Sequence, residues 1–226
     1  MDKYLIVGLG VFGKELARNL IEMGKEVIAV DRRIDLIEEI QDEVTLALKL
    51  DATDERALQS IGADEIDVAI VCIGEHFESN LLTAVNLKQL GAKKVIARAS
   101  DGIQERILKA VNVDMVISPE VEAADKLSYQ LVYKGLVDVS YIGGDTIMAK
   151  VVTPKVFEDK SLLDIQLRSK YNLNLVSVHT PREDEEGKKL PPLINNSPGA
   201  DTVLKEGDIL VIVGSNKNLK KLADLD

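Results

Sequence analysis

The sequence predicts an α/β chain: a Rossmann-like, doubly wound parallel sheet followed by a small α+β module. Three observations lead to this prediction. Strand-like and helix-like segments alternate over the first part of the chain, up to about Gly135. A glycine-rich turn joins the first of these strands to the first helix. Beyond Gly135 the strict alternation stops, which indicates a second module.

Each element of the first part is expected from its periodicity and its flanking residues. Parallel strands alternating with helices predict the sheet order 3-2-1-4-5-6, with a ligand over the carboxyl ends of the strands. Asp35, Asp54 and Asp101 stand near helix starts and are candidate N-caps. The strands are expected near residues 3–8, 26–31, 45–50, 67–73, 94–98 and 114–118, and the helices near 11–23, 34–42, 54–60, 76–90, 101–110 and 120–134.

The turn after the first strand reads Gly8-Leu9-Gly10-Val11-Phe12-Gly13, a GxGxxG fingerprint in its full strand–turn–helix–strand context. Gly8 permits the tight turn, Gly10 permits close approach of a phosphate, and Gly13 permits close helix packing. Asp31 ends the second strand, where a carboxylate accepts hydrogen bonds from ribose hydroxyls. The arrangement predicts an adenine nucleotide, with Val11 and Phe12 at the helix N-terminus.

The loops after the other strands supply the remaining candidate binding residues. Asp51 either borders the adenine or caps the next helix, and Arg98 either reaches a terminal phosphate or pairs with a nearby acid. Asp31 argues against a 2′-phosphate and hence against NADP. The candidates in these loops are Arg32, Asp51, Ala52, Thr53, Ile73, Gly74, Glu75 and Arg98.

The predicted domains are residues 1–138, which bind nucleotide, and residues 139–226, a regulatory or dimerisation module. In the second domain we expect strands at 151–154, 173–179 and 209–213, helices at 160–168 and 217–222, and a hairpin tip at 180–189.

The composition of the chain reduces the number of possible functions. The net charge of −10 opposes nucleic acid as a partner. The single cysteine, Cys72, excludes an intramolecular disulfide and reads as a buried residue of the fourth strand. No apolar run approaches a membrane span, and the first strand follows Met1 so closely that no signal peptide is expected, which favours a cytoplasmic protein. Neither His76 nor His179 has a catalytic partner at motif spacing, so binding without catalysis is favoured.

Several of these motifs together resemble the RCK domains that regulate potassium channels and transporters of the Trk and Ktr type. The second part resembles the TrkA-C module, and the pairing of one N-lobe with one C-lobe resembles the Ktr-type subunit. The motifs of the first part are Gly8 to Gly13, Val30-Asp31, Asp51-Ala52-Thr53, Ala97-Arg98-Ala99 and Ser118-Pro119-Glu120; those of the second are Leu167 to Asn174 and Ser197 to Asp208.

The resemblance implies a homo-octameric ring of dimers, docked on a potassium-translocating membrane subunit of the Ktr or Trk type at the inner face of the membrane. Binding of ATP or ADP, or of NAD or NADH, would change the conformation of the ring. Glu120 would be the carboxylate of an intra-dimer Mg²⁺ or Ca²⁺ site; otherwise it is simply an acid that opens a helix. Many relatives carry arginine at the position of Val11, which puts the usual recognition of ATP in doubt here.

The C-lobe of such proteins can bind cyclic di-AMP. By resemblance, Arg168 would contact phosphate, and Asn174, Leu175 and Pro198 would frame adenine; the alternative is a purely structural dimerisation module. We therefore expect a non-enzymatic, nucleotide-gated regulator of potassium uptake. The alternatives are an NAD-dependent oxidoreductase or redox sensor of unknown substrate, and a free-standing nucleotide sensor for another transporter.

Overall fold

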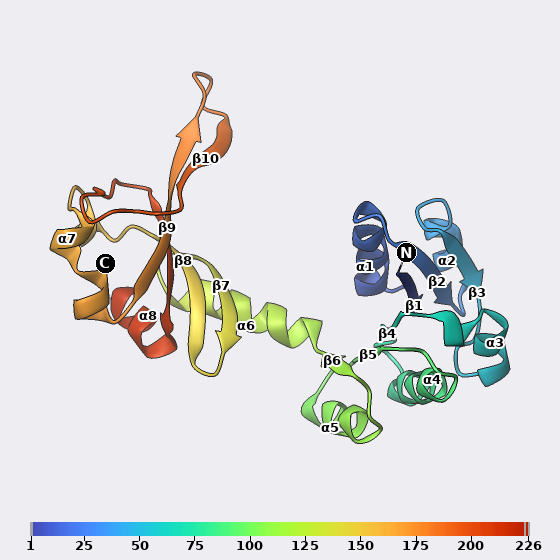
Figure 1. Cartoon of the computed structure of the whole chain (residues 1–226). Coiled ribbons are helices and arrows are strands. Elements are labelled where there is room, and N and C mark those ends of the chain that lie inside the picture. Colours follow the sequence, from blue (N-terminus) through green and yellow to red (C-terminus); the bar gives the residue numbers. More distant parts are fainter. Residues whose placement is uncertain (1, 224, 226) are drawn as a thin grey trace. The chain divides into compact units, whose positions relative to one another are not determined.

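The computed structural model describes residues 2–223 and 225 of the chain. It divides into two compact units, the first ending at Val121 and the second beginning at Glu122 (Figure 1). The functional division expected between residues 138 and 139 stays a prediction.

The first unit contains a six-stranded, all-parallel sheet in the order β3-β2-β1-β4-β5-β6, which confirms the predicted doubly wound topology. The reversal of strand order lies between β1 and β4, where such sheets bind their ligands. The strands are β1 (Lys3–Val7), β2 (Glu26–Asp31), β3 (Leu46–Lys49), β4 (Val68–Val71), β5 (Val95–Arg98) and β6 (Met115–Ile117). The helices are α1 (Val11–Glu22), α2 (Ile34–Ile40), α3 (Glu55–Ser60), the 3₁₀ turn η1 (Ala63–Glu65), α4 (Phe77–Gln89) and α5 (Gly102–Ala110).

Alternate residues of the parallel strands pack against helices on opposite faces of the sheet, as the period of two requires. On one face Ile6 of β1 packs with Ala17 of α1 and Ile40 of α2. On the other face Leu5 packs with Leu58 of α3 and with residues of α4 and α5. The central strands of the sheet are therefore buried on both sides, which leaves the ends of the strands as the place for a site.

Side-chain caps confirm two of the three predicted helix starts. Asp54 accepts from the N–H of Arg56, and Asp101 accepts from the N–H groups of Ile103 and Gln104. The prediction for Asp35 is wrong. It lies in the first turn of α2 rather than at the N-cap, which is Arg33.

The helix α6 (Pro119–Val132) begins in the first unit and continues into the second. The second unit has a five-stranded antiparallel sheet, ordered β10-β9-β11-β8-β7. Its strands are β7 (Leu136–Gly143), β8 (Thr146–Val152), β9 (Asn174–Glu183), β10 (Lys189–Asn195) and β11 (Ile209–Ser215). Its short helical segments are η2 (Lys155–Phe157), α7 (Leu162–Ile165), the π-helical turn η3 (Leu167–Tyr171) and α8 (Asn216–Ala223).

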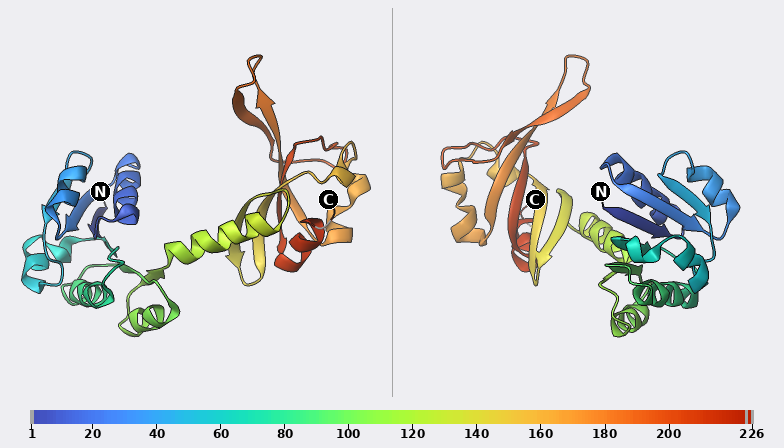
Figure 2. Two further views of the ribbon diagram at one scale, coloured as in Figure 1. Left: turned by 180° about the vertical axis from the view of Figure 1, so that it is seen from behind. Right: turned by 45° about the vertical axis from the view of Figure 1, so that its right-hand side comes forward.

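The structure corrects several expectations for this unit. Strands β7 and β10 were not anticipated, and β8 begins five residues before the expected strand at 151. The helix expected over 160–168 is interrupted at Gln166, whose φ of 55° places it in the left-handed region. The hairpin of β9 and β10 extends the expected tip into paired strands and projects from the rest of this unit (Figure 2).

Candidate functional site

A cavity of about 750 Å³ lies at the carboxyl ends of the strands of the first unit. Its volume is in the range of pockets that bind small molecules. All predicted binding residues of this unit line it except Gly13, and Glu120 lines it as well. The lining residues that were predicted are Gly8, Gly10, Val11, Phe12, Asp31, Arg32, Asp51, Ala52, Thr53, Ile73, Gly74, Glu75, Arg98 and Glu120.

The glycines of the turn serve different geometric needs. Gly8 has a φ of +93°, in the left-handed region that favours glycine. A Cβ on Gly13 would lie 2.0 Å from the carbonyl oxygen of Gly8, so α1 packs on the turn too closely for any side chain. A Cβ on Gly10 would meet nothing within 4 Å. Gly10 is thus the glycine whose space is left open to a ligand.

Helix α1 begins directly at this open space. Its N-cap is Gly10, which offers no side chain to cap the first N–H groups. The first N–H groups of a helix have no partner within the helix and carry partial positive charge. The start of α1 is therefore suited to an anionic group, while the side chain of Val11, 82% exposed, adds no charge to it.

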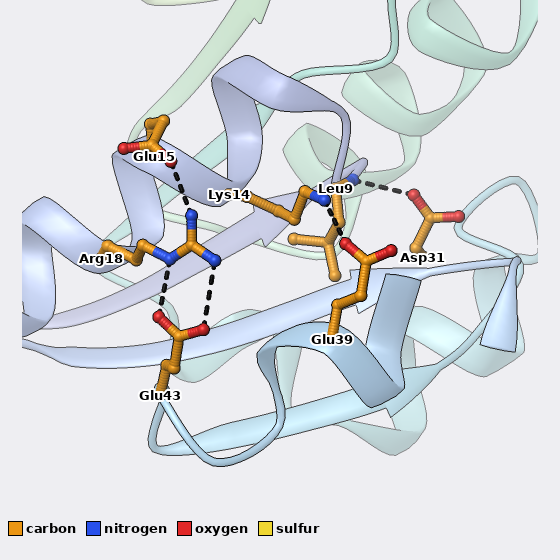
Figure 3. Close-up of polar contacts among 7 residues, drawn as sticks. All are labelled: Leu9, Lys14, Glu15, Arg18, Asp31, Glu39 and Glu43. Carbon is orange, nitrogen blue, oxygen red and sulfur yellow. Dashed lines mark hydrogen bonds and ion pairs between the residues drawn. The ribbon is translucent and has the colours of Figure 1, made fainter. Parts of the chain in front are cut away.

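Asp31 joins the glycine turn to the end of β2. One carboxylate oxygen accepts from the N–H of Leu9 at 2.8 Å (Figure 3). The other accepts from the N–H of Arg33 at 2.9 Å. The residue is 9% exposed. Each carboxylate oxygen has further lone pairs, so Asp31 can hold the turn and still accept from a ligand hydroxyl.

Asp51 and Thr53 form a local turn rather than a helix cap. Asp51 Oδ1 accepts from the N–H of Thr53 at 3.0 Å and from its hydroxyl at 2.7 Å. These bonds, the hydroxyl first, hold the pKa of Asp51 below its ordinary value. Asn86 of α4 donates to the carbonyl oxygen of Thr53, which fixes the loop against the fold.

Arg98 closes the other side of the cavity, and it pairs with Glu120 in the first turn of α6. Of the two alternatives for Arg98, this pairing with an acid is the one that the structure contains. A Cβ on Gly74 would lie 2.6 Å from Arg98 Nη1, so the guanidinium lies against the backbone at the end of β4. Asn80 donates to the carbonyl oxygens of Ile73 and Arg98, at 2.7 and 3.2 Å, and so ties the ends of β4 and β5 together.

The cationic side chains of α1 are already engaged by acids. Lys14 pairs with Glu39, and Arg18 lies between Glu15 and Glu43, at 2.6 Å from each (Figure 3). These carboxylates, Glu43 first, raise the pKa of the Arg18 guanidinium. The beginning of α1 therefore receives little net positive charge from its own side chains.

The lining includes residues that the sequence reasoning did not assign to the site. Val7, Leu50 and Cys72 stand at or just beyond strand ends, and Glu15, His76 and Ser79 belong to helix starts. Position next to the assigned loops is the signal that could have identified them. Cys72 lies one residue beyond β4 rather than within it, and burial raises the pKa of its thiol to about 12, which makes it unreactive. These lining residues are Val7, Glu15, Leu50, Cys72, His76 and Ser79.

A second pocket, of about 820 Å³, lies in the second unit. It gathers all four residues that the resemblance assigns to cyclic di-AMP. Leu162 and Leu163 of α7 add apolar surface, and Gly199 and Ala200 complete the loop side. The assigned residues in its lining are Arg168, Asn174, Leu175 and Pro198.

The described residues form no metal cluster and no membrane-spanning helix. Among the described residues, no three or more His, Cys, Asp or Glu side chains are grouped to hold a metal. No helix in the described part of the chain is long and apolar enough to cross a membrane. His179 lies within β9 rather than at its end, and its Nε2 is 3.0 Å from the hydroxyl of Ser177.

The sequence of this chain matches two protein-family models and is similar to several known proteins. The TrkA-N domain model matches residues 4–119 and the TrkA-C domain model matches residues 147–225. Ktr system potassium uptake protein C of Bacillus subtilis is 28% identical over 219 residues, covering 97% of this chain and 95% of the relative. Protein A of the same system and organism is 25% identical over 97% of this chain and 94% of its own length.

Solved structures share the fold. The RCK domain of GsuK superposes with a TM-score of 0.67 at 17% identity, over 99% of this chain and 47% of that chain. This chain therefore spans about half the length of that protein. The NAD(P)-binding domain of an exopolyphosphatase-related protein from Archaeoglobus fulgidus has a TM-score of 0.50 at 26% identity, covering 55% of this chain and 95% of its own.

Proposed function

The chain belongs to the TrkA-N domain family, with a TrkA-C domain behind it, and on this basis we propose that it is a nucleotide-binding regulatory subunit of a potassium uptake system. The proposal is supported by relatives that are named Ktr system potassium uptake proteins and that align over nearly their whole length. Membership over the full chain, rather than over the nucleotide-binding half alone, favours a shared role.

The ligand of the first unit, in this proposal, is an adenine nucleotide. The observation that carries it is the convergence of the glycine turn, Asp31 and the Asp51 loop on one cavity. Asp31 would accept from the ribose, the N-terminus of α1 would receive the phosphates, and Thr53 would border the adenine. The related fold described as an NAD(P)-binding domain supports the same class of ligand.

We propose ADP or NAD(H) in preference to ATP. Val11 brings no charge to the phosphates, and Lys14 and Arg18 are engaged by glutamates. Arg98 is then the cation best placed for a terminal phosphate, and it has Glu120 beside it. A ligand with few negative charges suits such a cavity better than one with four.

The proposed partner is a potassium-translocating membrane subunit, beneath which copies of this chain assemble as dimers into an octameric ring. The protein would then lie in the cytoplasm, at the inner face of the membrane through its partner. A nucleotide regulates such an assembly only if it binds two ring conformations with unequal affinity.

We propose no catalytic activity. A dehydrogenase needs an acid or base beside its nicotinamide, held by an orienting partner. His76, exposed at the start of α4, lines the cavity, but no side-chain hydrogen bond orients it within the described structure.

Two further ligands belong to the proposal. A Mg²⁺ or Ca²⁺ ion on Glu120 would need additional ligands from the nucleotide or from a second copy, because the described residues of one chain offer no complete set. Cyclic di-AMP would bind in the second pocket, with Arg168 on a phosphate and Asn174, Leu175 and Pro198 around adenine.

Growth of a bacterial strain that lacks its own Ktr regulatory subunit tests this function. At limiting potassium, the wild-type chain expressed with its own membrane subunit should restore growth, and Asp31→Ala should not. A wild-type chain that binds adenine nucleotides but never restores potassium-dependent growth would contradict the regulatory role.

A further inference from the structure

Glu120 stands where a ligand phosphate would compete with it. It pairs with Arg98, and both side chains line the cavity of the first unit. We propose that Glu120 is a specificity-determining residue that occupies Arg98 and so weakens the binding of phosphate-bearing ligands to this cavity. This inference rests on the proposed function, since it concerns the same site.

The backbone holds the bases of the two side chains in fixed positions. The N–H of Ala99 donates to the carbonyl oxygen of Ile117 at 2.9 Å, and Asn80 donates to the carbonyl oxygen of Arg98. Glu120 follows three residues after Ile117, in the first turn of α6. Competition for Arg98 therefore needs only side-chain rotation, with no change in the sheet.

The two partners differ in their freedom to move. The side chain of Arg98 is 19% exposed and its guanidinium lies against Gly74, whereas the side chain of Glu120 is 59% exposed. The buried Arg98 Nε has no hydrogen-bond partner within the described structure, so the pair with Glu120 does not use every donor of the guanidinium. Glu120 can turn toward solvent while Arg98 stays at the cavity wall to meet an incoming anion.

The relative strengths favour exchange. A pair with one well-exposed partner contributes little to stability because water screens it. A phosphate offers a guanidinium two parallel, charge-assisted hydrogen bonds. The phosphate displaces the carboxylate, but each ligand that reaches Arg98 must first overcome the existing pair. Ligands without a phosphate near Arg98 do not meet this cost.

The test is a double-mutant cycle read by calorimetric titration with ADP in EDTA, which removes any effect of divalent cations. Glu120→Gln should tighten ADP binding by about two- to fivefold, the effect of a partly exposed ion pair. Arg98→Gln should weaken it by about tenfold or more. In the double variant, Glu120→Gln should have no further effect, because its target is gone.

Two controls make the cycle specific. Glu122→Gln removes the same charge from an exposed position of α6 outside the cavity and should leave ADP affinity unchanged. The second control is adenosine, which carries no phosphate. Its affinity, measured by displacement of ADP, should be equal for wild type and Glu120→Gln. Thermal melting identifies any variant that is not folded. If Glu120→Gln does not fold, Glu120→Asp replaces it, and a smaller gain in ADP affinity is expected because the shorter side chain reaches Arg98 less well.

The outcomes distinguish a failure of the competition for Arg98 from a failure of the proposed nucleotide site. Unchanged or weaker ADP binding by folded Glu120→Gln, or an equal gain for adenosine and ADP, overturns the competition. A wild-type protein that binds neither ADP nor adenosine overturns the proposed nucleotide site itself, and the competition with it.

Discussion

The first unit gathers its cavity at one edge of a parallel sheet, whereas the second unit forms its pocket among short helical turns beside an antiparallel sheet. Parallel strands end at the same edge, so every loop that follows a strand contributes to the site. Neighbouring antiparallel strands end at opposite edges, so their loops do not converge. Sheet topology therefore positions the first site, while local backbone turns position the second.

The largest effect expected from this difference lies at the tight glycines. Gly13→Ala should lower the free energy of unfolding of the first unit by about 3 kcal/mol, because its Cβ would meet the rigid backbone oxygen of Gly8. Gly214→Ala should cost less, about 1–2 kcal/mol, because its Cβ would lie nearest to a side-chain carbon of Leu173 rather than to a backbone oxygen. Hydrogen exchange of each unit, recorded at increasing denaturant concentration, measures the free energy of unfolding for both variants.

Gly10→Ala is the matched control within the same turn. Its Cβ meets nothing within 4 Å, so unfolding should change by less than about 1 kcal/mol while ADP affinity falls. Equal destabilisation by Gly10→Ala and Gly13→Ala would show that close packing does not distinguish the two glycines.

Asp31 tests whether a single side chain couples fold and site in the first unit. Asp31→Ala leaves the N–H groups of Leu9 and Arg33 without their acceptors and should cost about 2 kcal/mol of stability. It should also weaken ADP binding by about tenfold or more, because it loses the ribose contact. Chemical denaturation and calorimetry provide the two readouts; unchanged affinity in a folded variant would remove Asp31 from the binding site.

Asp114 of the first unit and Asp138 of the second are carboxylates that different partners stabilise in the charged form. A bond from the N–H of Val95 holds the pKa of Asp114 below its ordinary value, with Lys88 contributing. The pKa of Asp138 is also lowered, mainly by its hydrogen bond with the ammonium of Lys126. A lowered folded pKa gives stability that is present above the unfolded pKa of about 3.9 and is lost as the pH falls through the folded value.

Asp114→Asn and Asp138→Asn should therefore each lose about 1 kcal/mol or less at pH 7, and their difference from wild type should vanish in strong acid. Added salt should shrink the Asp138 effect more, because a backbone N–H bond is screened less than a partly exposed ion pair. Melting curves between pH 2 and pH 7, at low and high salt, check this. A salt response that is equal for both variants would contradict the assignment.

The smallest stability effect is expected at the second pocket. Arg168 is exposed, so Arg168→Ala should change the free energy of unfolding by less than about 0.5 kcal/mol. It should abolish binding of cyclic di-AMP if that ligand occupies the pocket. Lys170→Ala removes the same charge from an exposed neighbour outside the pocket lining and is the control. Retained binding in Arg168→Ala would favour the structural alternative for this module.

The two units also differed in how far sequence reasoning predicted them. In the first, each buried strand is a short apolar run and each loop follows it directly, so the order of strands and most of the lining residues could be inferred. Asp35 was misjudged because the chain already turns into α2 at Arg33, two residues earlier. The pairing of Arg98 with Glu120 joins the end of β5 to the first turn of α6, and only the structure shows which acid is near Arg98.

In the second unit the signals were weaker for physical reasons. Residues 189–195 of β10 are exposed throughout, so no alternation marks that strand. In β8, Ile147, Ala149 and Val151 are buried alternately, a pattern that could have extended the strand expected at 151. The break at Gln166 depends on a left-handed backbone at a non-glycine residue, which local sequence rules do not anticipate.

Binding of an adenine nucleotide of low charge in the cavity of the first unit can be measured by calorimetric titration of the wild-type chain with ADP, ATP, NAD⁺ and NADH, each with and without Mg²⁺. We expect saturable binding of ADP or a nicotinamide dinucleotide. This binding should be tighter than that of ATP without Mg²⁺ and should be lost in Asp31→Ala. Absence of binding by all four, or binding that Asp31→Ala leaves unchanged, would contradict it.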